Sequence, residues 1–315
     1  MDIKINDYCV VIASHISKEK RIAYLIECLQ SLIEQIVVIP IYLSISFGSP
    51  ELHSLTLNTI YRTIQHESLF IYVRPEKTPQ MRHIYYLYQE VLKNHKWIMF
   101  CDDDDTYNKN RTIQIITYIS HYSNQIEHLA GLYESTFGKN HKEQRHEYWM
   151  YCITYNILQQ FYEIVSKYPN IMDNTCCDVL FGEFIRRLKY EKIFIQMKEK
   201  YYNYRIENNE DSVTGFIQSK QSNYRNVLQP PSIQSKEFEK HVISFNEFFS
   251  DNLHIYLHDT YLRTLVGTPF DLILQNELLA NYSILEFINK ENIDKIKEIH
   301  KELLNVCNEL YEIPI

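Results

Sequence analysis

The chain has 315 residues, of which 45% are hydrophobic and 23% charged, as in a globular protein of one or two domains. Its formal net charge of -8 and its scattered basic residues argue against nucleic acid as a partner, because phosphate binding needs a basic surface. Seven cysteines without a CxxC pair, and apolar runs too short to span a bilayer, predict reduced thiols, no integral membrane segment and a cytoplasmic location.

The first third of the chain alternates between short apolar runs and segments whose apolar residues recur at helical spacing. The runs predict strands at residues 7–14, 36–44, 69–73 and 97–101, of which the first and the fourth are expected to be buried. The segments between them predict amphipathic helices over residues 18–35, about 50–64 and about 81–92. Because strands alternate with helices, we expect right-handed crossovers and an α/β fold with a largely parallel sheet.

The rest of the chain completes this unit and then becomes mainly helical. Further strands are predicted at residues 128–135 and 147–155, helices at about 158–167 and 178–189, and a pair of strands within residues 192–206. These patterns predict three parts: a catalytic domain over residues 1–215, a linker or long loop over 216–240, and a helical C-terminal region over 241–315.

The last helix carries apolar residues at alternating spacings of three and four: Ile296, Ile299, Leu303, Val306 and Leu310. This stripe predicts a helix that packs on its own domain or, alternatively, forms the seam of a homodimer.

Four consecutive aspartates, Asp102 to Asp105, directly follow the strand predicted at residues 97–101. They could form a solvated acidic loop. However, ligands of parallel sheets bind beyond the carboxyl ends of the strands, where these residues lie. Mn²⁺ and Mg²⁺ prefer carboxylate oxygens, and Mg²⁺ usually takes one or two carboxylates together with substrate phosphates. We therefore predict a Mn²⁺ or Mg²⁺ that bridges the aspartates to a phosphorylated ligand.

Residues 7–205 resemble the nucleotide-sugar glycosyltransferases of the GT-A fold, closest to glycosyltransferase family 2. The resemblance rests on "VVIASH" as the first strand, "LIECLQSLIEQ" as the helix behind it, "MRH" before the fourth strand, and "MFCDDDDTY" as the DxD element. The "DDDTY" portion also looks like the DxD segment of fringe-like transferases. The resemblance implies metal-dependent transfer of a sugar from a nucleotide-diphosphate donor to a hydroxyl of a glycan or glycoprotein acceptor, with inversion at the sugar.

The resemblance also implies roles for individual residues. Asp103 and Asp105 would be the metal ligands, with Asp102 and Asp104 as the other register of the motif. The nucleotide-sugar contacts would be Ala13, Ser14, His15, Ser46, Arg82, Asp103 and Asp104. Arg82 would face the diphosphate, and its alternative role is a solvated helix charge.

One stretch departs from the family pattern. After its second strand the family commonly carries "DDGS", whose carboxylate contacts the nucleobase, whereas this chain has "ISFGSP" with Ser46 and Phe47 in those places. The identity of the base therefore stays open.

Asp178, in "NTCCDVLFGEFIRR", is the residue that the resemblance implies as catalytic base. The family places an acidic residue at the start of a helix, where it deprotonates the acceptor hydroxyl, and Cys177 here replaces the first member of the usual acidic pair. The alternative for Asp178 is a first-turn charge stabilised by the helix dipole. Asp173 and Glu183 are weaker candidates.

Two other functions compete with glycosyl transfer. "DDDDT", residues 102–106, matches the DxDxT motif of haloacid-dehalogenase-type phosphatases, with Asp102 as nucleophile and Asp104 as acid and base. That motif normally lies on the first strand, and three predicted strands precede it here. The second competitor is a GT-A-like module that binds a nucleotide or glycan without turnover.

Overall fold

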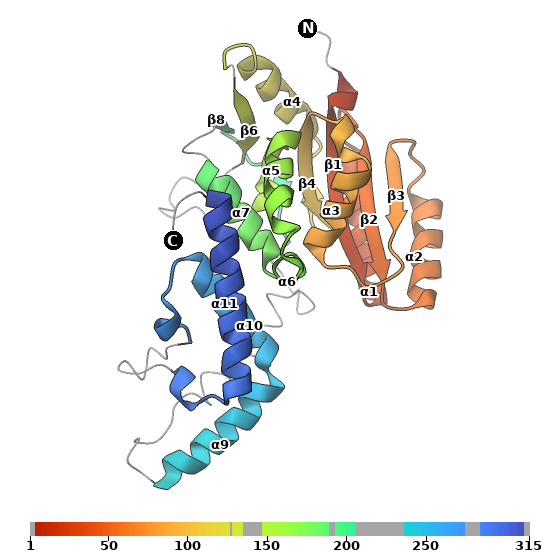
Figure 1. Cartoon of the computed structure of the whole chain (residues 1–315). Coiled ribbons are helices and arrows are strands. Elements are labelled where there is room, and N and C mark those ends of the chain that lie inside the picture. The colour runs from red at the N-terminus through yellow and green to blue at the C-terminus, as the bar shows by residue number, and fades with distance from the viewer. Residues whose placement is uncertain are drawn as a thin grey trace. The chain divides into compact units, whose positions relative to one another are not determined.

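The computed structural model describes residues 4–126, 128–134, 147–188, 193–205, 236–274 and 284–311. The chain divides into two compact units (Figure 1). Unit 1 comprises Met1–Lys167 and Met172–Arg205, and unit 2 comprises Tyr168–Ile171 and Ile206–Ile315. Residues 206–235, which include most of the predicted linker, lie outside the described residues. Residues 236–240, predicted as the end of that linker, are helical, because helix α9 begins at Lys236.

Unit 1 is built on a seven-stranded sheet in the order β3-β2-β1-β4-β7-β6-β8. Its strands are β1 (Tyr8–Ile16), β2 (Ile41–Phe47), β3 (Leu69–Val73), β4 (Trp97–Asp102), β6 (Leu129–Tyr133), β7 (Tyr151–Thr154) and β8 (Ile193–Gln196). Every pair is parallel except those that β7 makes with β4 and β6. The mostly parallel sheet confirms the predicted α/β class.

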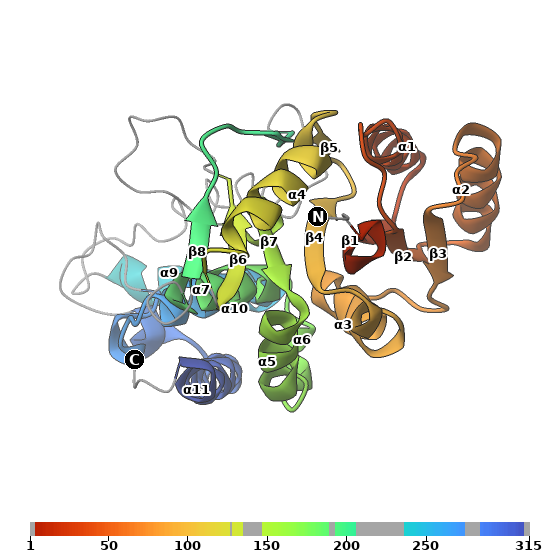
Figure 2. The ribbon, with the colours of Figure 1, turned by 90° about the horizontal axis from the view of Figure 1, so that it is seen from above.

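Helices flank both faces of this sheet. They are α1 (Glu19–Ile33), α2 (Pro50–Thr63), α3 (Gln80–Glu90), α4 (Arg111–Tyr122), α5 (Tyr155–Val165) and α7 (Cys177–Leu188), while the short α6 (Pro169–Met172) lies at the boundary between the units. Seen from above, α1, α2 and α4 cover one face, and α3 and α5 the other (Figure 2). Helix α7 contacts both α3 and α5 and so belongs to the second layer.

Three predicted strands differ in their limits or partners. β2 starts at Ile41 rather than residue 36, since Pro40 has no N–H for the ladder, although its carbonyl accepts a hydrogen bond from Val10 N at 2.9 Å. The strand predicted at 147–155 is a 3₁₀ turn (Tyr148–Met150) followed by β7. The predicted pairing within residues 192–206 is wrong, because β8 pairs with β6 while β9 (Tyr202–Asn203) pairs with β5 (Thr106–Tyr107).

The register of the central strands brings their carboxyl ends to one edge of the sheet. Ala13 on β1 lies opposite Asp102 on β4, and His15 on β1 lies opposite Ser46 on β2. Residues that are far apart in the sequence therefore meet at the edge where ligands of such sheets bind.

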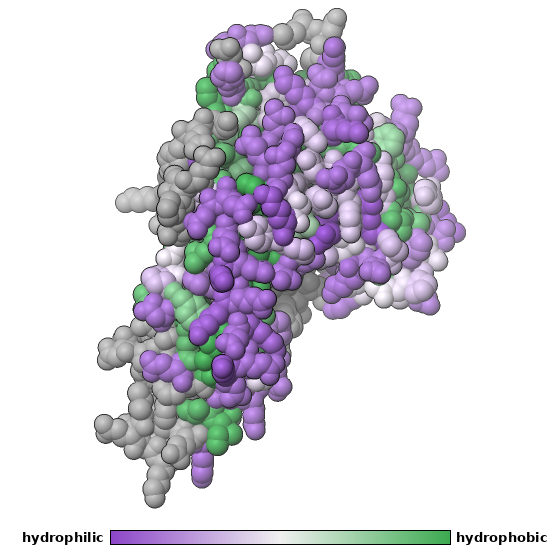
Figure 3. Space-filling view, viewed as in Figure 1, coloured by the Kyte–Doolittle hydropathy of each residue, from purple (hydrophilic) through white to green (hydrophobic). Residues whose placement is uncertain are grey.

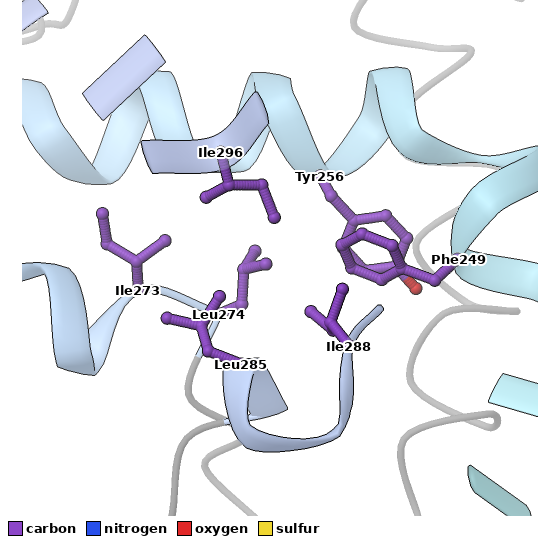
Figure 4. Close-up of a cluster of buried hydrophobic side chains, with 7 residues drawn as sticks. All are labelled: Phe249, Tyr256, Ile273, Leu274, Leu285, Ile288 and Ile296. Carbon is purple, nitrogen blue, oxygen red and sulfur yellow. The ribbon is translucent and has the colours of Figure 1, made fainter. Parts of the chain in front are cut away.

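Unit 2 is helical in the part that the structure describes. Its main helices are α9 (Lys236–Asp251), α10 (Leu253–Leu265) and α11 (Lys290–Tyr311), with 3₁₀ turns at Phe270–Leu272 and Ile284–Phe287. Figure 4 shows a cluster of buried apolar side chains in this unit, in which Phe249 stacks on Tyr256 with ring centroids 3.7 Å apart. No helix among the described residues is both long enough and apolar enough to cross a membrane.

The apolar stripe predicted for the last helix lies on α11. Ile296, Leu303 and Val306 are completely buried within the fold of one chain, Leu310 is nearly so, and Ile299 is half-buried. The side of α11 that faces the viewer in Figure 3 is mostly hydrophilic. This burial is what packing on its own chain requires, while a homodimer remains a prediction.

Candidate active site

Asp102 is the last residue of strand β4 and Asp103 directly follows it, and their side chains bind residues from opposite helix layers. Asp103 lies on the α1 side, where Ser14 Oγ donates to its Oδ2 at 2.6 Å and the Arg21 guanidinium pairs with its Oδ1. A second nitrogen of Arg21 bonds Asp104 Oδ2 at 3.1 Å. Burial raises the pKa of Asp103 to about 6, even though Arg21 lowers it.

Asp102 lies on the α3 side. Its Oδ1 accepts hydrogen bonds from Gln80 Nε2 at 2.9 Å and from the Tyr148 hydroxyl. Burial raises the pKa of Asp102 well above its usual range, and the charges of neighbouring carboxylates, Asp178 among them, raise it further. The ionised form of Asp102 is thus disfavoured at this position.

Asp105 is held by the short strand β9. The Tyr202 hydroxyl donates to Asp105 Oδ2 at 2.8 Å, and the Arg205 backbone N–H donates to Oδ1 at 2.8 Å. The Arg205 side chain donates to the backbone carbonyl of Asp104 at 2.9 Å and pairs with Glu27. Burial raises the pKa of Asp105 to about 7, although the Arg205 N–H lowers it.

The acidic run is therefore faced by two arginines and by neutral donors. Arg21 approaches from α1 and Arg205 from the end of β9. Neither was identified from the sequence, because each lies far along the chain from the aspartates and belongs to no motif. Gln80, Tyr148 and Tyr202 were missed for the same reason, and in a chain with 26 tyrosines an isolated Tyr is weak evidence.

A buried ion pair supports β9 from behind. Arg111, at the start of α4, is fully buried, pairs with Glu134 and donates to the Trp149 carbonyl at 3.0 Å. Glu134 also accepts the backbone N–H groups of Tyr201 and Tyr202, the latter at 2.9 Å. The pair thus links α4, β6 and β9, and through β9 it positions the donors to Asp105.

A divalent cation fits this site only in an open form. All four carboxylate oxygens of Asp103 and Asp105 already accept hydrogen bonds, and the described residues contain no group of three His, Cys, Asp or Glu side chains suited to a metal. A closed protein-made metal site therefore does not fit. Carboxylates gathered at a strand end do suit a cation that arrives with phosphates, since Mg²⁺ then needs only one or two of them.

The three residues predicted at the end of β1 have different environments. Ser14 is buried and donates to Asp103, whereas Ala13 and His15 are partly exposed. His15 Nδ1 lies 2.9 Å from Ser46 Oγ. Ser46 is itself completely buried and cannot touch a ligand without a rearrangement, so any role in nucleotide binding is indirect.

Arg82 and the weaker base candidates lie in surface ion pairs. Arg82 makes two hydrogen bonds to Asp173, at 2.6 and 2.7 Å. Glu183 pairs with Arg186 at 2.6 Å. Asp173 and Glu183 are therefore each engaged with an arginine at the surface of unit 1.

Asp178 lies in the first turn of α7 and is partly exposed. Its charge is close enough to contribute to the raised pKa values of Asp102 and Tyr148. Asp178 is therefore near Asp102 in the fold, although more than seventy positions separate the two residues in the sequence.

The raised pKa values predict that stability falls as pH rises. The folded state holds protons on Asp103 and Asp105 up to pH about 6 and 7, whereas the ordinary aspartate value is 3.8. The stability that these two groups contribute is therefore fully present below about pH 3.8 and is lost as pH rises to about 7. We expect the free energy of unfolding, measured with urea, to be about 1–3 kcal/mol lower at pH 8 than at pH 5.

Asp105→Asn should remove much of this pH dependence, because an amide cannot ionise. Asp271→Asn, at an exposed aspartate of unit 2, is the matched control and should keep the wild-type difference. If both variants show the same pH dependence of stability, the ionisation of Asp105 is not its source.

Unit 1 is an α/β domain with an acidic run at the carboxyl edge of a mostly parallel sheet. The sequence matches no protein-family model and no curated protein. Among solved structures, the chain is similar to S. aureus TarS residues 1–349, with a TM-score of 0.48 at 12% identity, over 97% of this chain and 90% of that one. The same TarS segment in complex with UDP gives a TM-score of 0.46 at 13% identity.

The complete TarS structure gives a TM-score of 0.43 at 12% identity, and the match covers 55% of its length. At such identity and overlap these likenesses decide neither the family nor the activity of this chain. The function is therefore inferred from the site itself.

Proposed function

We propose that unit 1 is a glycosyltransferase of the GT-A type, which moves a sugar from a nucleoside-diphosphate donor to a hydroxyl of a glycan or glycoprotein. One observation carries this proposal. The ends of β1, β2 and β4 and the start of α7 gather Ser14, His15, the four aspartates and Asp178 at one edge of a parallel sheet. This edge is where such sheets bind nucleotides, and the resemblance to glycosyltransferase family 2 points to the same residues.

In the proposed reaction Asp178 accepts the proton of the acceptor hydroxyl as its oxygen attacks the anomeric carbon. The bond from that carbon to the diphosphate oxygen breaks, and the nucleoside diphosphate leaves with the bonding electrons. This single displacement inverts the sugar. A bound Mn²⁺ or Mg²⁺, held by Asp103 and Asp105 together with the phosphates, would offset the charge on the departing diphosphate. Arg21 and Arg205 hold the acidic run in place.

The geometry disfavours the phosphatase alternative. A phosphatase of that type needs Asp102 as an ionised nucleophile. Here burial raises the pKa of Asp102 well above its usual range, even though the hydrogen bond from Tyr148 lowers it. A carboxyl group that favours its neutral form is a poor nucleophile.

A thermal-shift panel tests the donor site. We expect one of UDP, GDP, dTDP and CMP, with Mn²⁺, to raise the melting temperature of wild type by several degrees, because a ligand at a hundred times its Kd adds about 2.7 kcal/mol. Asp105→Ala should lose this ligand-dependent shift, while Asp271→Ala should retain it. A shift that does not need Mn²⁺ would remove the metal from the proposal. No shift with any nucleotide would contradict the donor site.

A binding module without turnover is the remaining alternative. It predicts the same thermal shift but no consumption of a nucleotide sugar in the presence of acceptors, so release of nucleoside diphosphate separates the two.

A further inference from the structure

A chain of hydrogen bonds runs through the interior from Arg74 to His15. Arg74 Nε lies 2.9 Å from Ser44 Oγ, and Ser44 Oγ lies 2.8 Å from His83 Nδ1. His83 Nε2 lies 3.1 Å from Ser46 Oγ, which in turn lies 2.9 Å from His15 Nδ1. Ser44, Ser46 and His83 are each at most 1% exposed, so water does not compete for these bonds.

Arg74, the first member of this series of hydrogen bonds, determines which atom donates in each of the bonds that follow. Arg74 can only donate, and Glu90 holds its guanidinium with bonds of 2.7 and 3.0 Å. Ser44 Oγ accepts from Arg74, and because His83 Nδ1 is the other partner of this buried hydroxyl among the described residues, the proton of Ser44 goes to His83 Nδ1. Neutral His83 must then carry its proton on Nε2 and donate it to Ser46.

The same reasoning extends to His15. Ser46 Oγ already accepts from His83 and from the Thr78 backbone N–H at 3.3 Å, so the proton of Ser46 is directed to His15 Nδ1. Neutral His15 therefore carries its own proton on Nε2. Burial lowers the pKa of His83 to about 3 and also lowers the pKa of His15, assisted by the charges of Lys77 and Arg21. Both rings are consequently neutral near pH 7.

His15 Nε2 is the open end of this chain. Among the described residues, no side chain or backbone group forms a hydrogen bond with that nitrogen. His15 is partly exposed and directly follows Ser14, which binds Asp103. An N–H group that is held in one direction at a site edge is suited to an oxygen acceptor.

We propose that His15 is a fixed Nε2–H donor that binds an oxygen of the nucleoside diphosphate, with Ser46, His83, Ser44 and Arg74 as positioning residues. The identity of the ligand rests on the proposed function, whereas the tautomer of His15 follows from the hydrogen bonds alone. Ser46 thus acts on the nucleotide through His15 rather than by contact. The oxygen belongs either to the diphosphate or to the nucleoside.

The tautomer is read by long-range ¹H–¹⁵N NMR of histidine-labelled wild type at pH 7.5, with the His15 signals assigned from their loss in His15→Gln. We expect Nε2–H tautomers for both His15 and His83. Addition of UDP should shift the His15 Nε2 resonance. Ser46→Ala should give a mixture of tautomers at His15. An Nδ1–H tautomer at His15 in wild type would overturn the inferred donor directions. This test is made on the wild-type protein and does not depend on the stability of a variant.

The role of the donor is tested by calorimetric titration with UDP and, separately, with inorganic pyrophosphate. His15→Leu should bind UDP about tenfold more weakly, the worth of one hydrogen bond, while His15→Gln, whose amide can donate from a similar position, should lie within about threefold of wild type. A parallel loss for pyrophosphate places the oxygen on the diphosphate, and a loss for UDP alone places it on the nucleoside.

Equal UDP affinity in wild type and His15→Leu would overturn the role of His15 as a donor to the nucleotide. If wild type binds neither UDP nor pyrophosphate, the proposed function and the ligand of His15 fail together, and the tautomer measurement still decides the chain of donors.

Discussion

Asp178→Asn is expected to reduce the rate of sugar transfer by about 10²- to 10⁴-fold, the range in which a general base contributes. Asparagine has nearly the same shape but cannot accept the proton of the acceptor hydroxyl. Nucleotide binding in the thermal-shift panel should persist, because the proposed donor contacts come from other residues. The measurement is the release of nucleoside diphosphate in the presence of acceptor.

Glu183→Gln, on the same helix, is the matched control. Glu183 is paired with Arg186, and its replacement should leave the transfer rate within a few-fold of wild type. The anomer of the product, determined by NMR, provides the second test. Retention of the donor's configuration, or an unchanged rate in Asp178→Asn, would contradict the proposed role of Asp178 as base. Neither result would bear on the fold.

Arg111→Met should produce the largest loss of stability, about 3–5 kcal/mol, because it leaves the charge of Glu134 buried without its partner. Neither side chain is more than 2% exposed, so water cannot replace the lost interaction. Urea unfolding followed by circular dichroism measures the change. β9 should loosen as well, since Glu134 holds its backbone N–H groups, and Asp105 should then lose donors.

Two further variants test this explanation. Arg62→Met removes an exposed arginine of α2 and should change the free energy of unfolding by less than about 0.5 kcal/mol. In Arg111→Met combined with Glu134→Gln, the uncompensated charge is gone while the amide oxygen can still accept the N–H groups of Tyr201 and Tyr202, so the double variant should be more stable than Arg111→Met alone. If the double variant is the less stable of the two, the buried charge is not the cause.

Much of the sheet follows from local sequence. β1 and β4 are runs of mostly buried apolar residues, whereas β3 is an apolar but partly exposed edge strand, and the limits of all three differ from the predicted ones by two residues or fewer. Such runs are distinctive because both faces of a central parallel strand are covered by helices. β2 was placed too early because Pro40 interrupts hydrogen bonding without interrupting the apolar pattern. The partner of β9 could not be predicted, since a two-residue strand carries no periodicity.

The sequence likewise pointed to some residues of the candidate site and not to others. The resemblance to glycosyltransferase family 2 pointed to Ser14, Asp103 and Asp178, and for the aspartates the predicted end of a strand pointed to the same position. Arg21 and Arg205 were not identified, since a charged residue on a helix or in a loop looks solvated until the fold brings it to a carboxylate. The metal ligands, the nucleotide contacts and the base remain predictions to be tested by the variants above.

Trp149 lies between the two tyrosines of β9 and its continuation, with ring centroids 4.2 Å from Tyr202 and 5.2 Å from Tyr204. The chain contains only two tryptophans, and the other, Trp97, stacks on Tyr8 at the opposite end of β4. Trp97→Phe therefore leaves a single tryptophan, whose fluorescence can be excited selectively over that of the tyrosines and which contacts the tyrosine that bonds Asp105. Its emission spectrum and quenching report the position of β9 on this site in real time, without any attached label.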